Sequence, residues 1–423
     1  MKGVDNASMD GVALSDEDRA ILALETASVA GHTCKVVLIA GGAPNADRLR
    51  SSIASRLSAT PALRRRLGGP AERPVWVDDE RFDVAEHVVA VAAEPCDEES
   101  LRSEVARLFA ERLDRRRPLW QIDLVERASG GTALVWRIHH ALADGTTAMR
   151  LADALLWDPD PAGGGEAGRG PAPHADGAWR RARLGAFARH ELALGAARSP
   201  FDGTIGTGRA VAFARAPLRE LHDAARRLAE ATVNDAVLTA VAGGLRAWLH
   251  THHGHVGHVR VKIPVSLHHA GDDAANRDSF FTLELPLGEP DVVARLAAVQ
   301  AATAVRKADH DAERLDELMR DLALASPQLD RLCRRLEASP RAFALNVSNV
   351  PGPARAVSVL GAPVEAVYSI AEIGERHALR IAVVSLAGRL HFGFCADPSI
   401  VGDVELLARA VEAEAAALVA AAR

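Results

Sequence analysis

The chain has 423 residues, of which 48% are hydrophobic and 25% are charged, values typical of globular proteins. This composition excludes wholesale disorder, a collagen-like repeat and a small disulfide scaffold, and at about 150 residues per domain the length predicts two to three domains. The net charge is −6, so the basic excess that a general nucleic-acid-binding protein needs is missing.

The amino terminus, residues 1–20, is polar and acidic, and no uncharged apolar run of 18 residues occurs in the chain. We therefore expect neither a secretory signal nor a membrane-spanning helix. The cysteines are far apart and form no CxxC pair, which favours a reducing compartment and a cytoplasmic protein. They are Cys34, Cys96, Cys333 and Cys395.

The first part of the chain alternates between strand and helix patterns. Residues 81–91 are predicted to be extended, and residues 98–113 carry apolar side chains at helical spacing. Residues 131–157 predict a strand, a loop and a helix. Apolar periodicity vanishes in the Pro- and Gly-rich residues 158–178. We therefore expect an N-terminal domain at residues 1–157 and a linker at residues 158–178.

The remaining residues, 179–423, are predicted to form a C-terminal domain. Helices are expected at residues 179–197, 215–231, 234–249 and 403–422. Strands are expected at residues 261–267, 342–348 and 364–370, with a hairpin of residues 378–385 and 389–396 around Ala387-Gly388. Mixed elements in both halves favour an α/β fold of the α+β type, with mixed sheets, over an all-parallel barrel.

The most informative sequence is HHALADG, which runs from His139 to Gly145. Because side chains alternate across a strand, His139 and His140 should point to opposite faces, and only one of them can face a given cleft. Asp144 is placed to cap the following helix, and Gly145 permits a positive φ or a close backbone approach. The pattern predicts an imidazole on a fixed strand end beside a sharp turn.

A neutral imidazole can remove a proton from an alcohol and return it to a leaving group. The segment therefore has the parts of a general-base site. Spacing alone leaves a second interpretation open, in which His139 and His140 are a satisfied structural pair within a strand.

Three further motifs lie around this segment. They are Pro118-Leu119-Trp120, Asn234-Asp235 and the SNVPGP segment that begins with Ser348-Asn349. Together with the HHxxxDG pattern, they resemble the bacterial wax ester synthase/diacylglycerol acyltransferase family of the chloramphenicol-acetyltransferase-like superfamily. The resemblance covers essentially the whole chain.

The resemblance implies two chloramphenicol-acetyltransferase-like domains with a tunnel at their interface. It also implies that His140 is the base that deprotonates an acceptor hydroxyl and that His139 supports it. Asp144 resembles the structural carboxylate of the family, and Gly145 resembles its tight turn. No acyl-enzyme is expected, because the base activates the acceptor directly, and no GxSxG elbow supplies a serine nucleophile.

The other motifs have less specific expected roles. Asn234 could donate a hydrogen bond to the developing oxyanion or position the acyl group, or it could cap the helix of residues 234–249. Asp235 is expected to be structural. The remaining motif residues supply no titratable group and are expected to shape the tunnel or to pack in the core. They are Pro118, Leu119, Trp120, Ser348 and Asn349.

The activity implied by the resemblance is O-acyl transfer from a long-chain acyl-CoA to diacylglycerol, to a long-chain alcohol, or to both. Acyl-CoA would be a co-substrate, and no cofactor, metal or nucleic-acid partner is expected. Two alternatives stay open: a donor bound to a carrier protein, and a non-catalytic paralogue that binds lipid. Because such acceptors partition into membranes, we expect peripheral association with a membrane or with lipid inclusions.

Two arginine runs and one histidine-rich stretch lie outside the motifs. Residues 64–66 and 115–117 could bind CoA phosphates or anionic lipid, or they could be solvated faces. Residues 250–258 read HTHHGHVGH, but neither a cysteine nor an acidic ligand adjoins them. A solvated loop is therefore favoured there over a metal site.

Overall fold

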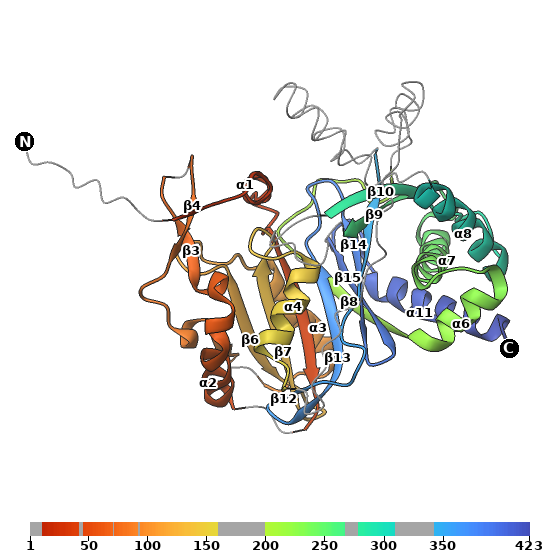
Figure 1. Ribbon diagram of the computed structural model, residues 1–423. Helices are drawn as coiled ribbons and strands as arrows, with labels where there is room; N and C mark the ends of the chain where they lie inside the picture. The colour runs from red at the N-terminus through yellow and green to blue at the C-terminus, as the bar shows by residue number, and fades with distance from the viewer. Residues whose placement is uncertain are drawn as a thin grey trace, which may run out of the picture. The chain divides into compact units, whose positions relative to one another are not determined.

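A computed structural model describes residues 11–41, 45–70, 72–91, 94–159, 199–266, 278–308 and 342–423 (Figure 1). The chain divides into two units. The first contains Met1–Pro159 together with Val357–Ala366, and the second contains Asp160–Ala356 together with Val367–Arg423. Each unit has its own six-stranded sheet.

The sheet of the first unit has two central strands that are buried nearly throughout. Its spatial order is β12 (Ser358–Val359), β13 (Ala362–Ala371), β2 (His32–Ile39), β7 (Thr132–His139), β6 (Trp120–Glu126) and β5 (Val88–Ala90). β7 pairs antiparallel with β2 and β6, whereas β5 runs parallel to β6. All residues of β7 are buried, and so are all but one of β2. These strands therefore form the core of the unit.

The helices of the first unit begin at polar capping residues. They are α1 (Asp16–Ala23), α2 (Ala46–Arg56), α3 (Glu98–Ala110) and α4 (Gly145–Leu155). Ser15, Asn45, Asp97 and Asp144 each accept a hydrogen bond from a backbone N–H of the first turn. A small sheet of β1 (Val12–Ala13), β4 (Val75–Asp78) and β3 (Arg65–Gly68) completes the unit, with short 3-10 helices η1 (Leu57–Ala59), η2 (Pro61–Arg64) and η3 (Val84–Glu86).

The sheet of the second unit is also mixed. Its order is β10 (Asp278–Glu284), β9 (Arg260–Ser266), β11 (Leu345–Val350), β14 (Leu379–Leu386), β15 (Arg389–Ala396) and β8 (Ala210–Pro217). β11 runs parallel to both of its neighbours, and the other pairs are antiparallel. The helices are α6 (Leu218–Ala229), α7 (Val233–His253), α8 (Val292–Ala308) and α11 (Val404–Ala421), and α7 packs on α8 and α11 (Figure 1).

One segment departs from the predicted division of the chain. Residues 357–366 were expected in the C-terminal domain, but they group with the first unit. The reason is strand pairing: β13 lies between β12 and β2, and Pro363 accepts a hydrogen bond from the N–H of Ala40. Beyond Ala366 the same strand belongs to the second unit, where the Tyr368 ring stacks on Phe213.

Most of the predicted elements that fall within the described residues are present, and the α/β fold with mixed sheets is confirmed. Two predicted segments are wrong in type. Residues 81–91 form η3 and the three-residue β5 instead of one extended strand, and residues 215–217 end β8 before α6 begins at Leu218. Of the predicted linker only residues 158–159 are described, and the helix predicted at residues 179–197 lies outside the described residues. Among the helices described, none is both long and apolar enough to span a bilayer.

The hairpin predicted around Ala387-Gly388 is confirmed, and its turn generates a prediction. Both residues have positive φ values, 48° for Ala387 and 81° for Gly388. An alanine in this region is strained, so Ala387→Gly should stabilise the second unit by about 0.5–1 kcal/mol, after allowing for the freer unfolded chain. Thermal unfolding checks this, with Gly388→Ala as the opposite control. A lower Tm for Ala387→Gly would contradict it.

Candidate active site

The HHxxxDG segment lies where β7 ends, at a central position of the first sheet. His139 is the last residue of β7, and its carbonyl accepts hydrogen bonds from the N–H groups of Leu142 and Ala143. The His140 N–H donates to the carbonyl of Gly31 (2.9 Å). The backbone on both sides of the histidine pair is therefore fixed by hydrogen bonds.

The ring of His139 is held from two sides. Its Nε2 lies 2.7 Å from a carboxylate oxygen of Glu25, and the N–H of Ala141 donates to its Nδ1 (3.1 Å). Because Nδ1 accepts a hydrogen bond, the proton of the neutral ring sits on Nε2 and is donated to Glu25. Only 1% of His139 is exposed. His139 is therefore a fixed ring in a single tautomer, and a reacting alcohol cannot reach it.

Glu25, which sequence reasoning missed, connects this histidine to an arginine. Arg115 Nη2 lies 2.9 Å from the carboxylate oxygen that His139 contacts, and it also donates to the carbonyl of Leu22. Burial alone would raise the pKa of Glu25, but the hydrogen bonds from His139 and Arg115 outweigh it and hold that pKa below its usual value. Glu25 therefore stays ionised near neutral pH.

Gly31 makes room for this contact, and sequence reasoning also missed it. Its φ is +75°, and a Cβ built there would lie 2.7 Å from Nε2 of His139 and 2.8 Å from Cγ of Glu25. Any side chain would displace the hydrogen-bonded pair as well as strain the backbone. Gly31 directly precedes β2, and its role is recognisable only from the pairing of β2 with β7.

His140 differs from its neighbour in exposure. It lies one residue past the end of β7 and is half-buried, whereas His139 is fully buried. Of the two histidines, His140 is therefore the more exposed one.

Asp144 and Gly145 form the start of α4. The Asp144 carboxylate accepts a hydrogen bond from the Thr147 N–H (2.6 Å), so the predicted cap is confirmed. Gly145 is the first residue of the helix and is absent from the glycines with positive φ. The positive φ that Gly145 would permit is therefore not used, because a helix start requires ordinary right-handed backbone angles.

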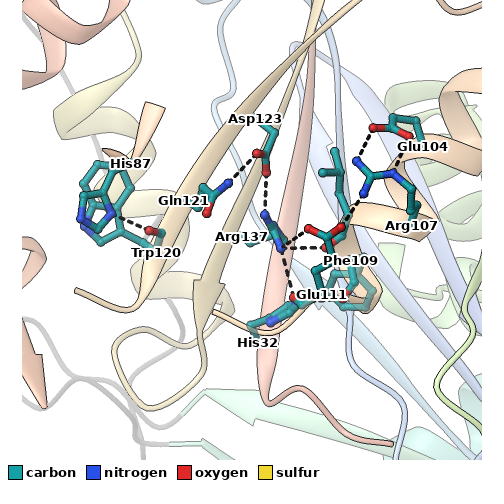
Figure 2. A network of polar contacts seen from close by, with 11 residues as sticks. His32, His87, Glu104, Arg107, Phe109, Glu111, Trp120, Gln121, Asp123 and Arg137 are labelled. Carbon is teal, nitrogen blue, oxygen red and sulfur yellow. Dashed lines mark hydrogen bonds and ion pairs between the residues drawn. The ribbon is translucent and has the colours of Figure 1, made fainter. Parts of the chain in front are cut away.

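A buried charged network surrounds Arg137, which lies on β7 two residues before His139 (Figure 2). Arg137 Nη2 lies 2.9 Å from the Asp123 carboxylate, and Nη1 donates to the carbonyls of Leu108 (2.8 Å) and Glu111 (3.0 Å) at the end of α3. The arginine thus ties α3 to β7 and β6. Burial, followed by the nearby charge of Arg137, lowers the pKa of His32 to about 3, so this histidine is neutral.

The Pro118-Leu119-Trp120 motif lies at the same end of the sheet as the histidines. The carbonyl of Leu119 accepts a hydrogen bond from the His139 N–H (2.9 Å). Trp120 is 1% exposed, donates from Nε1 to the Leu63 carbonyl (2.8 Å) and stacks on His87. The motif therefore packs in the core and holds the backbone at the end of β7.

The Asn234-Asp235 motif opens α7 in the second unit. The capping residue is Thr232, which forms a capping box with Asp235, so the expectation that Asn234 could be the cap is wrong. Asp235 is 2% exposed and also accepts a hydrogen bond from Thr303 (2.6 Å). Asp235 is structural in the described geometry, whereas Asn234 is half-buried on the first turn.

Ser348 and Asn349 lie in β11, and both are half-buried. The chain then passes very close to β14: a Cβ on Gly352 would lie 2.2 Å from the carbonyl oxygen of Ser385, whose hydroxyl accepts from the Gly352 N–H (3.0 Å). The glycine of the SNVPGP segment is therefore required for this backbone approach.

Carboxylates pair with Arg65 and Arg66 of the first arginine run and with every residue of the second. Arg115 pairs with Glu25, Arg116 with Asp114 and Arg117 with Glu86. Arg116 and Arg117 border a cavity of about 1150 Å³, where six carboxylate residues outnumber four arginines. Its lining consists of Arg66, Val77, Asp78, Asp79, Glu80, Arg81, Asp83, Glu86, Asp114, Arg116 and Arg117. This charge balance does not favour polyanionic CoA phosphates.

The histidine-rich stretch, residues 250–258, contacts neighbouring side chains of α7 and β10. His252 stacks on Trp248 at a centroid distance of 4.2 Å, and His258 contacts Glu284. Within the described ranges, no group of three or more His, Cys, Asp or Glu residues is arranged to hold a metal ion.

The sequence matches one protein family over both parts of the chain. Residues 14–189 match the wax ester synthase/diacylglycerol acyltransferase catalytic domain, and residues 274–418 match the WS/DGAT C-terminal domain. The chain is 30% identical over 422 residues to the "Probable diacyglycerol O-acyltransferase tgs1" of Mycobacterium tuberculosis (strain ATCC 25618 / H37Rv), covering 91% of this chain and 90% of that protein.

Solved structures share the fold. The wax ester synthase/diacylglycerol acyltransferase from Marinobacter aquaeolei VT8 is 23% identical, with a TM-score of 0.73 over 97% of this chain and 99% of that one. The first condensation domain of the CDA synthetase is 18% identical, with a TM-score of 0.59 over 97% of both chains. By its sequence matches and its intact HHxxxDG segment, the chain belongs to the wax ester synthase/diacylglycerol acyltransferase family.

Proposed function

We propose that the protein is an acyl-CoA-dependent O-acyltransferase that transfers a long-chain acyl group to diacylglycerol, to a long-chain alcohol, or to both. The observation that carries this proposal is the difference between two adjacent histidines. Glu25 and the Ala141 N–H hold His139 in place, whereas His140 is half-buried at the strand end. Membership of the family and its named relatives support the substrate classes.

In the proposed reaction, His140 removes the proton of the acceptor hydroxyl as the oxygen attacks the thioester carbonyl carbon. The tetrahedral intermediate then collapses: the C–S bond breaks, the ester C–O bond remains, and the imidazolium returns its proton to the CoA thiolate. No covalent enzyme intermediate forms. Palmitoyl-CoA and hexadecanol would thus give hexadecyl palmitate and CoA.

The neighbouring residues have supporting roles in this proposal. Glu25 and Arg115 fix His139, and His139 with the Gly31 carbonyl fixes the backbone from which His140 projects. Asp144 keeps the loop after β7 in place by capping α4. Because Thr232 already caps α7, the side chain of Asn234 is not used as the cap of that helix.

We further propose that the enzyme works at the surface of a membrane or of lipid inclusions, because both acceptor classes partition into lipid. Acyl-CoA is the proposed donor, and the chain would need no metal or prosthetic group. A carrier-bound donor is the competing possibility, and offering palmitoyl-CoA without any carrier protein separates the two.

The first test of the function is His140→Ala. Loss of the general base should reduce acceptor-dependent CoA release by about 10²- to 10⁴-fold. The measurement is CoA release from palmitoyl-CoA with dioleoylglycerol, with hexadecanol, or with no acceptor. His222→Ala, an exposed histidine of α6, is the matched control and should retain full activity. An unchanged rate in His140→Ala would remove His140 from the mechanism.

The second test asks whether Glu25 positions His139 for the reaction or only stabilises the fold. Glu25→Gln keeps the shape but weakens a hydrogen bond to a charged group, so kcat should fall by about 10-fold while KM for both substrates stays constant. The control is Glu104→Gln, which removes another arginine-paired carboxylate of the first unit and should leave kcat unchanged. Equal losses in the two variants would refute a positioning role for Glu25.

The pH dependence of stability gives a further readout for Glu25. Because its pKa is lowered in the folded protein, the ionised carboxylate stabilises the fold at pH values above the ordinary glutamate pKa, and this contribution disappears as the pH falls through the lowered value. The parent should therefore have a higher Tm than Glu25→Gln at pH 7. This difference should narrow below about pH 4. A gap that stays constant or widens in acid would contradict the assignment.

A further inference from the structure

Residues 357–366, which we call the crossover segment, belong to the first unit although the chain on both sides of them belongs to the second. They contain β12 and the first part of β13, and β13 continues at Val367 into the second unit (Figure 1). Because the segment is far in sequence from the rest of the first unit, its attachment to that unit depends on noncovalent contacts.

Asp158 makes four hydrogen bonds with the crossover segment, from 200 residues earlier in the chain. Its carboxylate accepts from the Ser358 hydroxyl (2.6 Å), the Leu360 N–H (2.9 Å) and the Gly361 N–H (2.8 Å). Its own N–H donates to the carbonyl of Ser358 (2.8 Å). Hydrogen bonds to an ionised carboxylate are roughly twice as strong as neutral ones, so this one residue is a strong attachment point.

The carboxylate of Asp158 is ionised near neutral pH and rests on a fixed backbone. Burial alone would raise its pKa, but the hydrogen bonds from the crossover segment outweigh burial and hold the pKa below its usual value. Arg56, at the end of α2, adds its positive charge and donates to the carbonyl of Trp157 (2.6 Å). The anchor point is therefore tied to α2 of the first unit.

The loop that Asp158 contacts has an unfavourable sequence. Val359 pairs with Ala362, so Leu360 and Gly361 form a two-residue hairpin loop between β12 and β13. Both loop residues have positive φ values, 54° and 83°. Such loops favour Asn-Gly or Gly-Gly, because a leucine is strained at positive φ. By accepting from both loop N–H groups, the Asp158 carboxylate offsets this strain.

The other polar contacts between the crossover segment and the first unit lie on β13. The N–H of Ala40 donates to the carbonyl of Pro363 (2.9 Å), and Arg127 pairs with Glu365 (2.7 Å). The side chain of Glu365 is 47% exposed, and ion pairs at such exposure contribute little to stability. Asp158 supplies the polar attachment at the opposite end, at β12 and the loop.

We infer that Asp158 anchors the crossover segment on the first unit, and that the hairpin of β12 and β13 detaches as a local unit when this anchor is lost. The inference concerns a conformational equilibrium of the chain and does not rest on the proposed function. The central strands β2 and β7 are paired along their whole length, so we expect them to stay folded when the hairpin opens.

The test is hydrogen exchange of the full chain, followed by mass spectrometry with residue-level fragmentation. Asp158→Asn keeps the shape of the side chain, but an NH₂ group replaces one acceptor oxygen and faces N–H and O–H donors. The informative amide is that of Val364, which donates to the Val357 carbonyl within the hairpin (2.9 Å) and does not touch Asp158. It should exchange about 10- to 100-fold faster in the variant, whereas amides of β7 should keep the parent rate.

Asp153→Asn is the matched control, because Asp153 is an exposed carboxylate of α4. It should leave exchange in the hairpin at the parent rate. If Val364 exchanged equally fast in Asp158→Asn and in the parent, Asp158 would not be the anchor. If β7 and the hairpin lost protection by the same factor, Asp158 would support the whole unit and local detachment would be wrong.

Two further variants test the same anchor if Asp158→Asn does not fold. Ser358→Ala removes one of the donors to Asp158, so exchange at Val364 should rise by about 3- to 10-fold. Leu360→Asn places a residue that tolerates positive φ in the loop, and added to Asp158→Asn it should restore part of the lost protection. No acceleration in Ser358→Ala, or no recovery in the double variant, would overturn the inference.

Discussion

The arrangement of the candidate site depends on one buried hydrogen bond, between Nε2 of His139 and the carboxylate of Glu25. It exists only because Gly31 has no side chain to occupy the same space. With the Ala141 N–H on the other ring nitrogen, it assigns the tautomer of His139 and removes that ring from chemistry. The adjacent His140 is half-buried, so of the two histidines it is the more exposed one.

This bond forms part of a wider arrangement of buried charge along β7. Arg137, two residues earlier, ties the end of α3 to the sheet through Asp123 and two backbone carbonyls (Figure 2). Charged groups inside a core are costly unless they are paired and hydrogen-bonded. The first unit satisfies this condition at Glu25 and at Arg137. The end of β7 is therefore held by polar contacts as well as by packing.

The two units use their sheets differently. In the first, the polar groups near the candidate base are compensated: Glu25 by Arg115, and Asp123 by Arg137. In the second, Lys262 and Arg380 flank Asn346 on one face of the sheet, opposite an apolar row.

Features that depend on residues close together in the chain could be predicted from the sequence. The HHxxxDG segment, the cap at Asp144 and the hairpin turn at Ala387-Gly388 depend on residues close together in the chain, and each was predictable. The prediction of one extended strand failed at residues 81–91, where the 3-10 helix η3 precedes the short strand β5. The grouping of residues 357–366 with the first unit was also missed, because it depends on pairing with strands more than 200 residues away.

What the sequence determined by itself was therefore the fold class, the family and the identity of the candidate base. Only the tertiary structure decided which groups surround that base. Glu25 and His139 are 114 residues apart, and strand register places Lys262 and Arg380 on either side of Asn346. Spacing along the chain contains no information about such contacts, because strand pairing and burial bring them together only after the chain has folded.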